Sequence, residues 1–190
     1  MTPPPGQLIL INGASSAGKT TLCRALRDAL PDTAAGPFLH FSLDFFMFDA
    51  DVLPRTLEGR VRNWNRIRPQ VFDGYYRCIP ALLSAGNNLV ADLIIETTMQ
   101  RDRLHELLVP YDVYWVGLHC PVEELERREA ARGDRKIGEA RRDAQTVHTF
   151  SAYDLNIDCR DSLEYQVERV IQGWAARRTA DNFTESLDGG

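Results

Sequence analysis

Residues 13–20 read Gly-Ala-Ser-Ser-Ala-Gly-Lys-Thr, a complete glycine-bounded phosphate-binding loop. The loop follows a short apolar run, Leu8-Ile9-Leu10-Ile11, which predicts a buried parallel strand. It precedes residues 21–30, where apolar side chains recur at helical spacing. A strand that leads through such a loop into a helix is the setting in which the motif binds phosphate. The sequence therefore predicts a nucleoside triphosphate site rather than a glycine-rich turn without a ligand.

Each part of the loop has an expected task. Gly13 and Gly18 let the backbone turn tightly, so that its N–H groups face an anion at the start of a helix. Lys19 is expected to reach the β- and γ-phosphates of ATP, and the Thr20 hydroxyl to hold Mg²⁺. The expected nucleotide-binding residues are Gly13, Ala14, Ser15, Ser16, Ala17, Gly18, Lys19, Thr20 and Thr21.

Length and composition indicate one ordinary globular domain. The chain has 190 residues, of which 44% are hydrophobic and 26% charged. We expect a single domain over 1–190, with a core at 7–176 and frayed tails at 1–6 and 177–190. The net charge of −5 argues against a nucleic-acid partner, and no apolar run is long enough to span a membrane. Because the N-terminus lacks the features of a signal peptide, we expect a cytoplasmic protein.

The four cysteines are scattered, with no Cys-x-x-Cys pair and no spacing typical of metal ligands. They are Cys23, Cys78, Cys120 and Cys159. We expect all of them to be small apolar residues in a reducing compartment.

Five arginines lie close together at positions 55, 60, 62, 66 and 68, in a stretch whose acidic residue is Glu58. A solvated surface is favoured for them over a site that binds an anion.

Strand and helix patterns alternate along the chain, which predicts a parallel sheet covered by helices on both faces. Strands are expected at 8–11, 38–41, 89–95, 113–118 and 153–157. Helices are expected at 21–30, 75–85, 101–108, from 121 onward and at 162–176, with irregular chain over the substrate at 45–68. The predicted fold is the three-layer α/β/α P-loop fold of kinase type, with a mainly parallel five-stranded sheet and a mobile lid.

Two carboxylates are expected near the sheet edge where ligands bind in such folds, because Asp44 follows the second predicted strand and Asp92 interrupts the third. Asp92, in the third strand, is a candidate for anchoring Mg²⁺ or its water, although it also suits a polar strand end. Asp44 follows the second strand between apolar neighbours, where it could accept the proton of an attacking hydroxyl. The alternative for Asp44 is a helix N-cap, a position that aspartate favours.

A basic turn at 131–136 contains Arg132 and Arg135, whose charges could close over the transferring phosphoryl group. The alternative is a solvated helix end, where basic residues are also favourable. Glu96 is a candidate for contact with the acceptor, whereas the lone His148 is expected to be structural.

Aromatic residues are dense between positions 45 and 76, and they suit either an acceptor pocket or the core. They are Phe45, Phe46, Phe48, Trp64, Phe72, Tyr75 and Tyr76.

Four stretches together resemble the chloramphenicol phosphotransferase family over most of residues 7–175. They are Asn-Gly-x-Ser-Ser-Ala-Gly-Lys from residue 12, Ser-Leu-Asp at 42–44, Trp-Val-Gly-Leu-His-Cys at 115–120, and Arg-Glu-x-Ala-Arg-Gly-Asp-Arg at 128–135, and His148 and the Tyr-Asp-Leu at 153–155 add to them. Members of that family are P-loop kinases that move the γ-phosphate of ATP onto a hydroxyl of a small antibiotic. The resemblance implies that Asp44 is the general base, that Lys19 and Thr20 contact phosphate and Mg²⁺, and that Arg132 and Arg135 are lid arginines.

The region expected to hold the acceptor departs from that family. Residues 45–76 and the Glu-Thr-Thr at 96–98 do not match its pattern, so the acceptor stays open. One alternative is a kinase for a nucleotide, sugar nucleotide or other anionic metabolite, bound by the arginines at 55–68. Another is a regulatory or toxin-like module that binds ATP and has no small acceptor. A carboxylate beside a second cavity next to the loop would favour a kinase.

Overall fold

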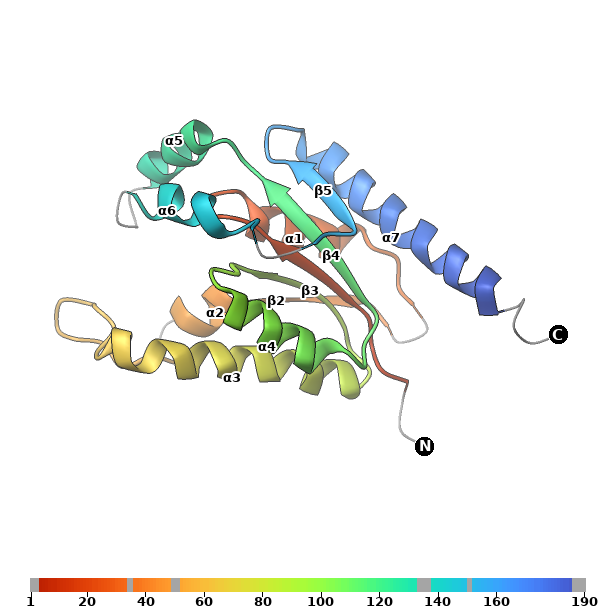
Figure 1. Ribbon diagram of the computed structural model, residues 1–190, viewed down its shortest axis with the longest axis horizontal. Coiled ribbons are helices and arrows are strands. Elements are labelled where there is room, and N and C mark those ends of the chain that lie inside the picture. The colour runs from red at the N-terminus through yellow and green to blue at the C-terminus, as the bar shows by residue number, and fades with distance from the viewer. Residues whose placement is uncertain (1–3, 34–35, 49–51, 133–137, 150–151, 186–190) are drawn as a thin grey trace.

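The computed structural model describes residues 4–33, 36–48, 52–132, 138–149 and 152–185 (Figure 1). Its strands are β1 (Leu8–Asn12), β2 (Phe38–Ser42), β3 (Asn88–Leu93), β4 (Val113–His119) and β5 (Leu155–Asp158). Its helices are α1 (Lys19–Ala29), α2 (Leu43–Phe48), α3 (Trp64–Ser84), α4 (Thr98–Leu108), α5 (Val122–Arg132), α6 (Glu139–Thr146) and α7 (Leu163–Glu185).

The five strands form one parallel sheet in the order β2-β3-β1-β4-β5. All five residues of β1 are buried, as expected for a central strand covered on both faces. The chain leaves β1 toward β2 on one side of it, and β4 lies on the other side. The loop after β1 therefore opens at the point where the strand order reverses, which is where ligands bind in open α/β sheets. The predicted fold class is confirmed.

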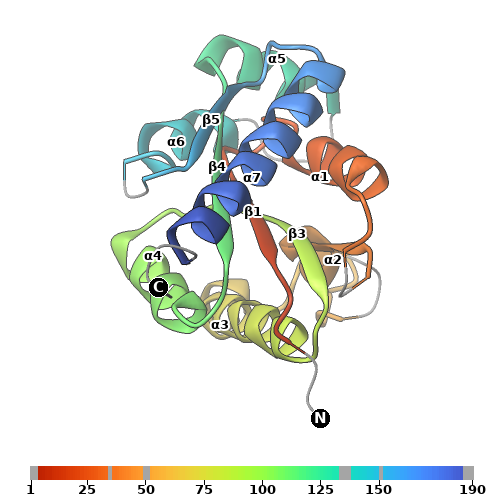
Figure 2. The same ribbon diagram turned by 90° about the vertical axis from the view of Figure 1, so that its right-hand side faces the viewer.

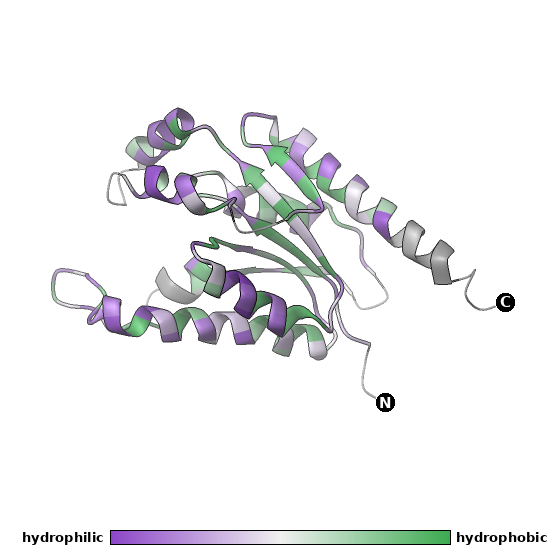
Figure 3. Ribbon diagram, in the orientation of Figure 1, coloured by the Kyte–Doolittle hydropathy of each residue, from purple (hydrophilic) through white to green (hydrophobic). Residues whose placement is uncertain are grey.

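Two apolar layers cover the sheet. Leu22 and Leu26 of α1 and Trp174 of α7 belong to one cluster, whereas Ile79 of α3 and Leu104 of α4 belong to the other. Figures 1 and 2 accordingly show α1 and α7 on one face and α3 and α4 on the opposite face. Beyond the carboxyl ends of β4 and β5 lie α5 and α6, whose residues are mostly hydrophilic (Figure 3).

Four expectations about the helices were wrong. Residues 43–48 and 64–74, mostly expected to be irregular, are helical in α2 and in the first half of α3. Pro69 and Pro80 lie inside α3, and arginines interrupt its amphipathic period, so its local sequence is a weak helix signal. Phe72 belongs to the apolar cluster between α3 and the sheet, and Trp64 packs against that cluster. Helix α6 was missed, and α7 extends to Glu185 rather than ending at the expected residue 176. Among the described helices, none is both long and apolar enough to cross a membrane.

The expectation of four unpaired cysteines was also wrong, because Cys120 and Cys159 form a disulfide. In the parallel register, His119 of β4 pairs with Asp158 of β5. The residues that follow are therefore neighbours, with their Cα atoms 5.1 Å apart, within the range that a disulfide needs. Thirty-nine positions separate the two cysteines in the sequence, so their pairing depends on the sheet register rather than on any local spacing. Cys23 and Cys78 are free.

Candidate active site

The loop between β1 and α1 has the backbone that its glycines predict. Gly18 adopts φ 103°, in the left-handed region that favours glycine, directly before α1. At Gly13 a Cβ atom would lie 2.7 Å from the carbonyl oxygen of Leu118 in β4, so a larger residue would displace the loop from the sheet. Both glycines are therefore required by geometry.

The inside of the loop is buried and polar. Ser15 and Ser16 are 2% and 9% exposed, and the Ser16 hydroxyl oxygen has no hydrogen-bond partner in the part of the chain that the structure describes. Lys19 Nζ donates to the carbonyl oxygen of Ala14 at 2.8 Å, so its ammonium lies over the loop. A buried hydroxyl without a partner beside an ammonium and a helix N-terminus suits the phosphate oxygens of a nucleotide.

The two residues expected to bind metal lie in contact. Thr20 Oγ1 donates to Asp92 Oδ2 at 2.8 Å, and the Asp92 side chain is 4% exposed. Burial alone would raise the pKa of Asp92, but the facing side chains of His40, Ser42 and Thr20 and the charge of Lys19 together hold it below its usual value. A hydroxyl beside an ionised carboxylate is a donor set that fits Mg²⁺.

Asp44 lies in the first turn of α2, close to this pair in the fold. Ser42, at the end of β2, is opposite Asp92 in the sheet register, so Asp44 is two residues beyond that point. The backbone N–H of Asp44 donates to Ser42 Oγ at 3.2 Å. Ser42 therefore caps α2, and the alternative of Asp44 as the N-cap is wrong.

Most of the predicted lid lies outside the residues that the structure describes. Arg132 is the last residue of α5, and its side chain and the whole of Arg135 are not described. Glu96, which follows β3, is half-buried and accepts hydrogen bonds from Arg68 and Gln100. It lies at the same edge of the sheet as Asp92 and stays a candidate for acceptor contact.

Most of the clustered arginines lie on the surface, and most of the described aromatic residues lie in the core. Arg55, Arg60, Arg62 and Arg66 are exposed, as the solvated-surface alternative predicts. Phe72, Tyr75 and Tyr76 belong to the core between α3 and the sheet. The Phe45 side chain is 37% exposed and Trp64 is half-buried, while the side chains of Phe46 and Phe48 lie outside the described part.

Two polar contacts to the loop escaped the sequence analysis. Asp143 of α6 is 6% exposed and accepts a hydrogen bond from the backbone N–H of Ser15 at 3.2 Å. Burial raises the pKa of Asp143. The apolar residues Ala140, Ala144 and Val147, which recur at helical spacing, were the available sequence signal for α6.

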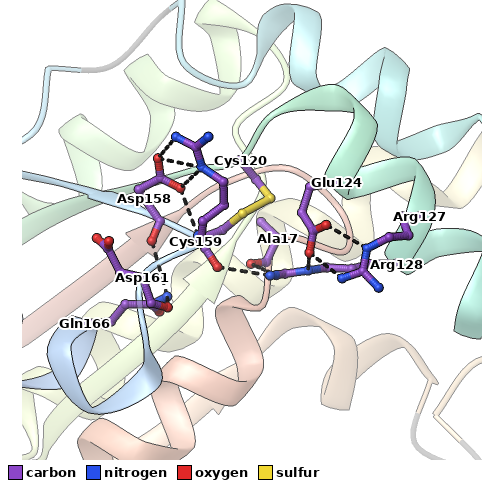
Figure 4. The surroundings of a disulfide bond; sticks show 10 residues. Ala17, Cys120, Glu124, Arg127, Arg128, Asp158, Cys159, Asp161 and Gln166 are labelled. Atoms are coloured by element: carbon purple, nitrogen blue, oxygen red, sulfur yellow. Dashed lines mark hydrogen bonds and ion pairs between the residues drawn. A yellow bond between two sulfur atoms is a disulfide. The ribbon is translucent and has the colours of Figure 1, made fainter.

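Arg128 of α5 joins the loop to the end of β5. Its guanidinium donates to the carbonyl oxygens of Ala17 and Cys159, each at 3.0 Å, and to Glu124 (Figure 4). The disulfide of Cys120 and Cys159 lies beside this contact. The phosphate-binding loop, α5 and the chain after β5 are thus held together by one side chain.

Asn12, at the end of β1, fixes the strand ends around the loop. Its Nδ2 donates to the Val147 carbonyl oxygen at 2.9 Å and to the Tyr153 hydroxyl at 2.7 Å, and its Oδ1 accepts from the Ile95 N–H at 3.0 Å. The side chain is fully buried, so its bonds to the backbone of Val147 and Ile95 are shielded from water, while the bond to Tyr153 is partly so.

Replacing Asn12 with alanine is expected to lower the free energy of unfolding by about 2–4 kcal/mol, because buried backbone groups lose their partners. The melting temperature should fall by roughly 5–15 °C, measured by circular dichroism. Asn65→Ala, at an exposed position of α3, is the matched control and should melt close to the unmodified chain. Equal melting temperatures for both variants would contradict this role of Asn12.

His148 is held as a neutral ring, in agreement with the structural role expected for it. It stacks on His119 with ring centroids 3.8 Å apart, and its Nδ1 lies 2.9 Å from the Tyr153 hydroxyl. Burial and then the neighbouring His119 lower the pKa of His148 from 6.5 to about 4.

This shift predicts a loss of stability in acid. Between about pH 6.5 and about pH 4 the unfolded chain binds a proton at His148 that the folded chain does not. The free energy of unfolding should therefore fall as the pH decreases through this window, and the fall should be smaller in His148→Gln. Denaturant titrations across the window measure it, with His105→Gln on α4 as the control. A slope unchanged in His148→Gln would show that His148 does not contribute.

Comparisons with known proteins agree with this geometry. The model of a family described as "Chloramphenicol phosphotransferase-like protein" matches residues 6–173. A Mycobacterium tuberculosis strain H37Rv protein named "Putative O-phosphotransferase" is 34% identical over 190 residues, covering 88% of this chain and 81% of that protein.

Solved structures show the same fold at low sequence identity. The Mycobacterium tuberculosis APS kinase CysC has a TM-score of 0.66 at 15% identity, covering 91% of this chain and 99% of that one. A gluconokinase from Sinorhizobium meliloti 1021 has a TM-score of 0.59 at 18% identity, covering 97% of this chain and 98% of that one. These neighbours share the P-loop kinase fold. On the match over residues 6–173, the chain belongs to the chloramphenicol phosphotransferase-like family.

Proposed function

We propose that this chain is a kinase that transfers the γ-phosphate of ATP to a hydroxyl group of a small molecule, with Mg²⁺ as cofactor. The contact of Thr20 with Asp92 beneath a complete phosphate-binding loop is the observation that carries the proposal. Family membership and the kinase fold support the reaction type.

The loop supplies the phosphate site. Its backbone N–H groups, the Ser16 hydroxyl and the Lys19 ammonium would surround the β- and γ-phosphates. Thr20 and Asp92 would hold Mg²⁺, which offsets the charge of the phosphates when bound. Arg132 and Arg135 are proposed to add positive charge from the lid side as the phosphoryl group moves.

Asp44 is the proposed general base. As the acceptor oxygen bonds to the γ-phosphorus, the bond from that phosphorus to the bridging oxygen breaks and ADP leaves. The hydroxyl proton passes to the Asp44 carboxylate. Its position two residues beyond the register partner of Asp92 supports this role, because it brings the base to the strand ends that hold the metal ligands.

The acceptor is proposed to bind between α2 and the first turns of α3. Arg68 pairs with Glu96 there, and its guanidinium stacks over Phe72 at 4.6 Å from the ring centroid. Because Glu96 already offsets this positive charge, a neutral hydroxyl compound fits better than an anion. Chloramphenicol-like antibiotics belong to that class, in which case the activity would confer resistance by inactivating the drug.

A panel assay tests the proposal. The purified chain is incubated with ATP and Mg²⁺ and with hydroxylated antibiotics, nucleosides, sugars and nucleotides, and ADP formation is measured. We expect one neutral class to raise ADP formation above the rate without acceptor. Stimulation by nucleotides or sugar nucleotides alone would favour the anionic alternative. ATP binding without stimulation by any acceptor would favour a regulatory or toxin-like module.

A further inference from the structure

Asp92 of the proposed magnesium site also belongs to a cluster of three candidate metal ligands. Cys23 of α1, His40 of β2 and Asp92 of β3 each offer one ligand atom, and these atoms lie within 4.8 Å of one another. His40 is opposite Val90 in the sheet register, and Asp92 is two residues after Val90, so both side chains point to the same face of the sheet. Helix α1, which carries Cys23, covers that face. The His40 ring contacts Phe45 at a centroid distance of 5.0 Å.

His40 has unsatisfied polar atoms in this cluster. Its side chain is 2% exposed, and across the described ranges neither ring nitrogen has a hydrogen-bond partner. Asp92 Oδ2 lies 3.8 Å from its Nε2, which is too long for a hydrogen bond. Buried nitrogens without partners are uncommon because they lose their bonds to water. A bound cation would satisfy the ring and would connect all three side chains.

The chemistry of the three ligands selects the class of cation. Thiolate, imidazole and carboxylate are the ligands that Zn²⁺ takes, and tetrahedral coordination would place their atoms about 3.5 Å apart. The present spacing thus needs only small side-chain movements. Mg²⁺ prefers oxygen ligands and does not suit a thiolate.

We infer that Cys23, His40 and Asp92 form a site for a thiophilic divalent cation of the Zn²⁺ class, and that its occupancy inhibits the kinase. On binding, the Cys23 thiol loses its proton to solvent and the thiolate bonds to the metal. The inhibition follows from one shared atom. Asp92 Oδ2 accepts from Thr20 at 2.8 Å and is also the oxygen that faces His40. A cation bound on the His40 side would withdraw Asp92 Oδ2 from Thr20 and from the proposed Mg²⁺. This second half of the inference therefore rests on the proposed function.

Cobalt titration tests the binding directly. The full chain is stripped of metal with a chelator and kept free of thiol reductants, so that the Cys120–Cys159 disulfide stays closed. Co²⁺ should produce a thiolate charge-transfer band and tetrahedral d–d bands at one equivalent, and Zn²⁺ should remove them. Absence of the charge-transfer band would overturn the inference.

Variants identify the ligands. Cys23→Ser should abolish the charge-transfer band and weaken Co²⁺ binding by ~100-fold. Loss of a residue that only supports a metal ligand already weakens metal binding by ~10- to 100-fold, and loss of a ligand should cost at least as much. Cys78→Ser, at the other free cysteine, is the matched control and should keep the band. If Cys23→Ser does not fold by circular dichroism, His40→Gln replaces it and should lose the same affinity. A band that disappears in Cys78→Ser would overturn the site.

Turnover separates the two halves of the inference. ADP formation is measured with and without Zn²⁺ at fixed Mg²⁺ and ATP, and the ratio of the two rates is compared between the unmodified chain and Cys23→Ser. We expect Zn²⁺ inhibition that is at least ~10-fold weaker in the variant, following its lost affinity. Equal Zn²⁺ inhibition of the unmodified chain and of Cys23→Ser would overturn the inference that the bound cation inhibits the kinase through Asp92. Cobalt spectra as expected in a chain that phosphorylates nothing would contradict only the proposed kinase activity.

Discussion

Replacing Lys19 with alanine is expected to reduce phosphotransfer by at least ~10³-fold, because a full positive charge on the phosphates is lost. The melting temperature should stay close to that of the unmodified chain. Lys19 Nζ donates to the Ala14 carbonyl oxygen within the loop, and the side chain belongs to neither apolar cluster. Turnover at saturating ATP and acceptor, together with thermal unfolding, measures both effects.

Arg27→Ala is the matched control for this variant. It removes a positive charge from the same helix, where Arg27 is exposed and pairs with Asp28, so turnover should change little. A reduction of similar size in both variants would indicate a general loss of charge rather than a phosphate contact. Near-normal turnover in Lys19→Ala would remove the loop from the proposed mechanism.

The fold and the loop could be predicted from the sequence because their signals are local. The β1 strand, the glycines and the period of α1 lie within about twenty consecutive residues, and the structure has all three as expected. The contact of Thr20 with Asp92 was also within reach, because the carboxyl ends of parallel strands meet at one edge of a sheet.

Features that depend on the register of distant segments were not predictable. The Cys120–Cys159 disulfide follows from the pairing of β4 with β5, and the cluster around His40 follows from the pairing of β2 with β3. The start of α3 at Trp64 could not be predicted, because its local sequence contains prolines and no clean period. The roles of Arg132 and Arg135 and the cytoplasmic location stay predictions.

Replacing Asp44 with asparagine is expected to lower phosphorylation of the acceptor by ~10²- to 10⁴-fold, the range typical of a positioned general base. The substitution is nearly isosteric and removes only the ability to accept a proton. ATP binding should change little, since Asp44 lies in α2, outside the loop that would hold the phosphates. Stability should also be nearly unchanged, because Ser42 Oγ accepts from the backbone N–H of residue 44, which asparagine keeps.

The matched control is Asp102→Asn on α4, whose exposed carboxylate pairs with Arg101 and should not affect turnover. Single-turnover rates with bound ATP separate the chemical step from nucleotide binding in each variant. A base at Asp44 predicts a slow chemical step with an unchanged ATP dissociation constant. Phosphorylation by Asp44→Asn at close to the unmodified rate would exclude Asp44 as the base. Glu96 would then be the next carboxylate to replace, because it follows β3 at the same edge of the sheet and is held there by Arg68 and Gln100.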